Sequence, residues 1–67
     1  MDFNSIKIGA KVNTAVMGGI VKECEVLDTK PAGGLVNWTT SKGNVVKLRV
    51  VGSKGRLYIV RTADQCW

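Results

Sequence analysis

A tripeptide repeat is the feature that most restricts how this chain can fold. Ser41-Lys42-Gly43 recurs twelve residues later as Ser53-Lys54-Gly55, and each copy lies between runs rich in Val, Leu, Ile, Thr and aromatic residues. Such runs fit the half-buried surface of a sheet, and Gly tolerates the left-handed backbone at the end of a three-residue hairpin loop. The sequence therefore predicts a three-stranded β-meander over residues 35–62.

Two equal turns also predict a register for the three strands. With Gly43 and Gly55 in the left-handed positions, Lys47 pairs with Arg61 and is opposed by Asn37 on its other side. A slip of one residue would turn every side chain of a strand to the other face. The predicted core face carries Val36, Trp38, Val46, Leu48, Val50, Tyr58 and Val60, and the opposite face carries Lys47, Arg49 and Arg61.

Basic residues are concentrated in the same half of the chain. Residues 29–63 hold seven Lys and Arg and no acid, whereas residues 1–28 hold three Lys and four acids. Basic groups without local counter-charges raise a positive potential that attracts phosphate backbones. The sequence therefore predicts a nucleic-acid-binding surface made of Lys42, Lys47, Arg49, Lys54, Arg56 and Arg61.

The first half of the chain predicts a hairpin followed by a loop. A strand beginning at Ile8 and ending at Met17 meets the turn residues Gly18-Gly19, and a second strand follows over residues 20–27. Neither face of that second strand is wholly apolar, which is typical of a strand that bends around a small barrel. Residues 28–34 contain the only Pro and a Gly-Gly pair, and are predicted to form the longest loop.

Five short strands joined by turns predict an all-β fold, a small barrel or half-open roll that spans residues 1–67 as one domain. The tail over residues 63–67 is expected to form one helical turn or a short strand that closes the barrel against the first strand.

The order and spacing of these elements resemble those of the SH3-like barrels, including KOW and Tudor-type modules. The resemblance covers Ile8 and Val12, the Gly18-Gly19 hairpin, the loop after Leu27, the meander and the terminal turn. KOW-type barrels are common in proteins that handle RNA or transcription complexes, so the resemblance implies a non-catalytic binding module.

The residue types of the chain argue against an enzyme. It has no His, its five acids are scattered, and neither Gly-Gly pair has the spacing of a phosphate loop. We therefore expect no catalytic residue, no cofactor and no metal. Cys24 and Cys66 are expected to be free thiols of a cytoplasmic protein, because the first twelve residues do not resemble a signal peptide and no apolar run is long enough to span a membrane.

A second functional hypothesis stays open beside the first. The predicted basic face lacks the aromatic residues that stack on bases, and it carries aliphatic side chains instead. The terminal Trp67 either caps the barrel or anchors a partner. The alternative is a protein-interaction or assembly module, such as a homo-oligomer or a small viral-type protein that docks on an acidic host protein, with an interface formed by Leu35, Val45, Val51, Leu57, Ile59 and Trp67.

Overall fold

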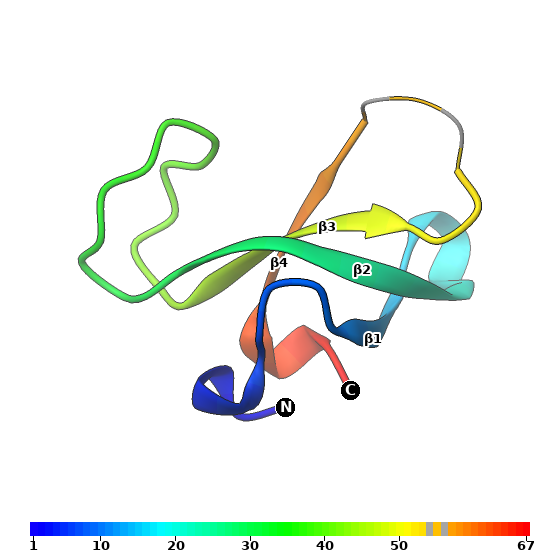
Figure 1. The fold of residues 1–67 in the computed structure, drawn as a ribbon, viewed down its shortest axis with the longest axis horizontal. Coiled ribbons are helices and arrows are strands. Elements are labelled where there is room, and N and C mark those ends of the chain that lie inside the picture. Colours follow the sequence, from blue (N-terminus) through cyan, green and yellow to red (C-terminus); the bar gives the residue numbers. More distant parts are fainter. Residues whose placement is uncertain (54, 56) are drawn as a thin grey trace.

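A computed structural model of the chain, which describes residues 1–53, 55 and 57–67, is all-β. Its four antiparallel strands form one sheet in the order β1-β2-β3-β4 and curl into a half-barrel (Figure 1). The strands are β1 (Lys11–Ala15), β2 (Val21–Lys30), β3 (Val45–Val50) and β4 (Ile59–Thr62). Three short 3-10 turns, η1 (Phe3–Ser5), η2 (Met17–Gly19) and η3 (Ala63–Gln65), precede, join or follow these strands.

The predicted first hairpin is confirmed. β1 pairs antiparallel with β2, with Val12 opposite Cys24, and the two strands are joined through η2. Gly18 and Gly19 both have positive φ angles, 76° and 77°, which side chains disfavour, so this Gly-Gly pair is what allows the turn. Val12 and Thr14 are buried while Lys11 and Ala15 are exposed, as the alternation along the strand predicts.

The core lies on the concave side of the sheet. Alternate residues of β1 to β3 point into it and meet residues from the two ends of the chain. β2 bends at a bulge between Val26 and Asp28, so it can pair with β1 at its start and with β3 over most of its length. The buried cluster consists of Ile6, Val12, Cys24, Val26, Val46, Leu48, Ala63 and Cys66.

The predicted register between the last two strands is wrong by one residue. Lys47 pairs with Val60 rather than with Arg61, and Leu48 pairs with Ile59. The connection is longer than the three-residue loop that was expected, since β3 ends at Val50 and β4 begins at Ile59. It opens with a turn that has Gly52 at φ of 82° and a 3.1 Å hydrogen bond from Ser53 N to Val50 O. Gly55 has φ of 135°, outside the αL region expected of it.

The predicted strand at residues 35–40 is also wrong. Residues 31–44, all described by the structure, form a loop without a strand, and β3 has β2 as its neighbour instead, with Val26 opposite Leu48. β2 continues to Lys30, three residues beyond the predicted end, so the loop starts later than expected. The loop extends from one end of the sheet, away from the two chain ends (Figure 1).

The tail forms both of the structures expected of it. η3 is a helical turn with a capping box between Thr62 and Gln65, and Cys66 then forms a β-bridge with Thr14 of β1. Two backbone hydrogen bonds, Asn13 N to Trp67 O at 2.7 Å and Trp67 N to Asn13 O at 3.0 Å, extend this pairing. The tail therefore closes the curled sheet against its first strand.

The closure can be tested at Thr14, which is 1% exposed and donates its hydroxyl to Gln65 O at 2.9 Å. Thr14→Val keeps the shape but removes the donor, and we expect the free energy of unfolding to fall by about 1–2 kcal/mol in urea denaturation. The matched control is Thr29→Val in β2, because the Thr29 hydroxyl makes no hydrogen bond to the described residues. Equal losses in the two variants would contradict this closure.

Candidate functional site

The convex side of the sheet, which we call the outer face, carries the side chains that point away from the core. Because Val46 and Leu48 point inward, Lys47 and Arg49 of β3 point outward, together with Glu25 and Asp28 as their partners on β2. The one-residue shift in β4 adds Tyr58 to this face. The Lys47 ammonium lies 4.3 Å from the centroid of the Tyr58 ring, a cation–π contact.

A second aromatic residue reaches the outer face from the loop. Trp38 donates its indole Nε1–H to Asp28 Oδ2 at 3.3 Å, and Asp28 is the cross-strand partner of Lys47. The loop therefore holds the indole beside the outer face, although the sequence pattern placed both Trp38 and Tyr58 in the core. The correct register would have placed Tyr58 on the outer face, because Tyr58 lies two residues before Val60, which pairs with the outward-facing Lys47.

Glu25 supplies part of the counter-charge on the outer face. Its carboxylate lies 3.1 Å from the Arg49 guanidinium and 3.7 Å from the Lys11 ammonium. All three side chains are partly exposed, so water and salt screen these pairs and each contributes little to stability. A competing anion can therefore replace Glu25 as the partner of Arg49 at small cost.

The structure brings together only some of the predicted basic residues. Lys47 and Arg49 share the outer face, and Lys42 is exposed on the loop. Arg61 is removed from the set, because it pairs with the inward-facing Val46 and its guanidinium donates to the carbonyl of Val60 at 2.9 Å. Lys54 and Arg56 lie outside the described residues.

The predicted protein interface is divided in the same way. Leu35, Leu57, Val51 and Trp67 are exposed, the first two at 98% and 86%. Val45 is 2% exposed where it pairs with Lys30 and Thr62, and the partly buried Ile59 packs against the core, so these two are not available to a partner in this fold. The wrong register explains the assignment of Ile59, whereas Val45 alternates with Lys47 and Arg49 along β3 and is nevertheless buried between β2 and β4.

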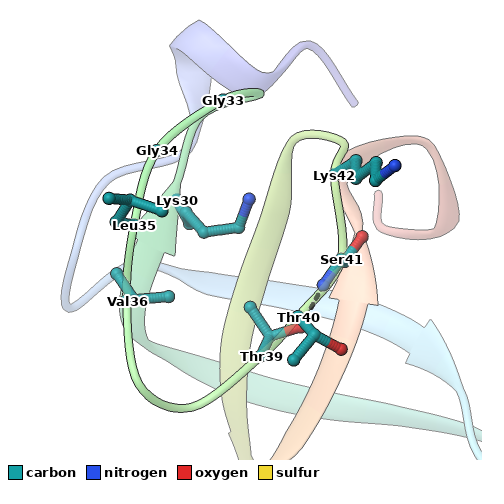
Figure 2. A pocket seen from close by; sticks show the side chains of 9 residues that line it. All are labelled: Lys30, Gly33, Gly34, Leu35, Val36, Thr39, Thr40, Ser41 and Lys42. Carbon is teal, nitrogen blue, oxygen red and sulfur yellow. Dashed lines mark hydrogen bonds between the residues drawn. The ribbon is translucent and has the colours of Figure 1, made fainter.

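A pocket of about 440 Å³ lies between the two limbs of the loop (Figure 2). Lys30, at the end of β2, extends sideways into the space between the limbs, and the side chain is only 2% exposed. Gly34 lies close over the stem of Lys30, because a Cβ at this position would be 3.2 Å from Lys30 Cγ and 3.1 Å from Pro31 O. The other lining residues are Gly33, Leu35, Val36, Thr39, Thr40, Ser41 and Lys42.

The described residues offer little for covalent or metal chemistry. No group of three or more His, Cys, Asp or Glu among them is arranged to hold a metal ion. Burial raises the pKa of the Cys24 thiol and that of the Cys66 thiol, so both stay protonated and poorly nucleophilic at neutral pH. Within the same described part of the chain, no helix is long and apolar enough to cross a bilayer.

Comparison with protein-family models, with curated proteins and with solved structures gives no match to this chain. The functional assignment therefore depends on the outer face and on the loop pocket.

The packing of the pocket can be tested at Gly34. Gly34→Ala forces the new methyl against Lys30 and Pro31, and we expect it to lower the free energy of unfolding by about 1–3 kcal/mol. Gly43→Ala, in the same loop, is the matched control, because a Cβ there meets nothing within 4 Å and its φ is not positive. Urea denaturation compares the two variants, and a stable Gly34→Ala protein would show that the loop does not close over Lys30.

Proposed function

We propose that this protein is a small SH3-like barrel that binds single-stranded nucleic acid on its outer face and has no catalytic role. The observation that carries the proposal is the placement of Lys47 over the Tyr58 ring, on the same face as Arg49 and beside Trp38. Cations for phosphates and exposed rings for bases are the two components of a surface that holds single strands.

The order of elements supports the SH3-like part of this proposal. Four antiparallel strands follow one another in the sheet, the second is long and bent, and a 3-10 turn leads into a tail that pairs with β1. Cys66 and Trp67 would be the fifth, very short strand of such a barrel. A small open barrel of this kind leaves a sheet face and the neighbouring loops free for a ligand.

The aromatic residues favour single strands over a duplex. Bases in a single strand are exposed and can stack on Tyr58, which is 43% exposed, and on the half-buried Trp38 ring. Phosphates would contact Lys47, and they would compete with Glu25 for Arg49. Because this surface mixes both charge signs, we expect modest affinity that falls with salt.

Fluorescence anisotropy with labelled single-stranded DNA and RNA, and with a duplex control, tests this function. Tyr58→Ala should weaken single-strand binding by about 1–3 kcal/mol, because a stacking surface is lost. Lys47→Gln should weaken binding to every sequence and reduce the slope of log K against log salt by about one, measured between about 50 and 200 mM salt.

Lys7→Gln is the matched control for charge, because Lys7 is exposed outside the four strands and its loss changes the net charge by the same amount. If Lys7→Gln and Lys47→Gln weaken binding equally, the attraction belongs to the net charge of the protein and not to the outer face. Tyr58→Ala binding as tightly as the unmodified chain would exclude stacking.

A second function, assembly with another protein chain, is favoured by a separate observation. Leu35 and Leu57 are almost fully exposed, and burying such side chains in an interface would favour assembly. Under this alternative, light scattering would report a mass above 7.2 kDa, and Leu57→Asp would return it to the monomer value. A monomer in both proteins would exclude self-assembly.

A further inference from the structure

Lys30 is a lysine in an unusual position. Its side chain is 2% exposed at the end of β2, beneath the loop, and its ammonium points into the space between the two limbs (Figure 2). Two carbonyl groups accept its hydrogen bonds, Gly43 O at 3.2 Å and Pro31 O at 3.4 Å. Both are long for charged donors, and an ammonium has three hydrogens to donate.

Among the residues that the structure describes, no carboxylate forms an ion pair with Lys30. Residues 29–63 contain no acid, and the side-chain ion pairs formed by the described residues both use Glu25. Asp28 is the acid nearest in sequence, and its carboxylate accepts from Trp38 Nε1 and from Thr29 N instead. A buried charge that is not paired is costly, so an anion bound beside it would be strongly favoured.

Residues with hydroxyl groups line the pocket from the opposite limb, and their oxygens point away from Lys30 in Figure 2. Thr39 Oγ1 accepts from Ser41 N at 3.1 Å, and Ser41 Oγ accepts from Gly43 N at 3.4 Å (Figure 2 shows the first bond). Because both hydroxyl oxygens act as acceptors in these bonds, their hydrogens remain available to donate. Thr40 adds a third hydroxyl to the lining.

We propose that the pocket between the limbs of the loop binds a phosphate monoester, with its oxygens on the Lys30 ammonium. A lysine acts as a point charge that suits a tetrahedral phosphate, whereas planar carboxylates are better matched by arginine. The volume of about 440 Å³ is within the range of small-molecule sites and admits a mononucleotide-sized ligand. This site is separate from the outer face, so it does not depend on the proposed function.

The test is a titration of the ¹⁵N-labelled protein, followed through its amide chemical shifts, with adenosine 5′-monophosphate, inorganic phosphate and adenosine at constant ionic strength. We expect saturable shifts at Gly33, Gly34 and residues 39–43 with both phosphate compounds and none with adenosine. Equal binding of inorganic phosphate and of the nucleotide identifies a free phosphate site, whereas tighter binding of the nucleotide identifies a phosphate ester. Shifts that do not saturate, or that adenosine reproduces, would overturn the proposal.

The variant Lys30→Met keeps the apolar stem and removes the charge, and it should weaken binding of the nucleotide by about tenfold or more. Lys22→Met is the matched control, because Lys22 is exposed near the start of β2 and does not line this pocket. An equal loss in both variants would overturn the proposal.

A measurement on the unmodified protein keeps the test decisive if Lys30→Met fails to fold. A ligand that binds only the folded state raises the melting temperature. Adenosine 5′-monophosphate should therefore raise it in a concentration-dependent manner, and chloride at the same ionic strength should not. Equal effects of the two anions would count against a phosphate site. Anisotropy with an unphosphorylated oligonucleotide measures binding to the outer face separately. The phosphate site can therefore fail its test while single-strand binding passes, and the reverse.

Discussion

The pairing register between β3 and β4 decides which side chains this protein presents to a ligand. β3 ends at Val50, β4 begins at Ile59, and their pairing aligns Lys47 with Val60. With that alignment Tyr58 joins the basic residues of the outer face, while Arg61 turns toward the core side. A pairing moved by a single residue would exchange the two and leave a basic face without a ring for stacking.

The loop over residues 31–44 makes the second contribution to the surface. Lys30 donates to carbonyls at both ends of the loop, Pro31 and Gly43, and so holds the two limbs together beneath the pocket. Trp38, between those limbs, docks on Asp28 at the edge of the outer face. One loop therefore serves two surfaces, the aromatic region beside Lys47 and the pocket around Lys30, and both are supported by the end of β2.

Local pattern was sufficient to predict the elements whose partners are close in sequence. The alternation around Val12 and the Gly18-Gly19 pair identified the first hairpin. The Ser-Lys-Gly repeat misled, because identical tripeptides lie in different backbone contexts and neither Gly43 nor Gly55 has the αL φ that a three-residue hairpin needs. The burial of Lys30 depends on a loop that folds back over it, which no local pattern records.

The most direct test of this account is a nuclear Overhauser measurement of the contacts between β3 and β4 in the free protein. We expect cross-strand contacts between Lys47 and Val60 and between Leu48 and Ile59, together with contacts from the Tyr58 ring to the Lys47 side chain. Contacts between Lys47 and Arg61, with Tyr58 facing the core, would contradict it. In that case the basic and aromatic residues would lie on opposite faces, and the proposed surface for single strands would not exist.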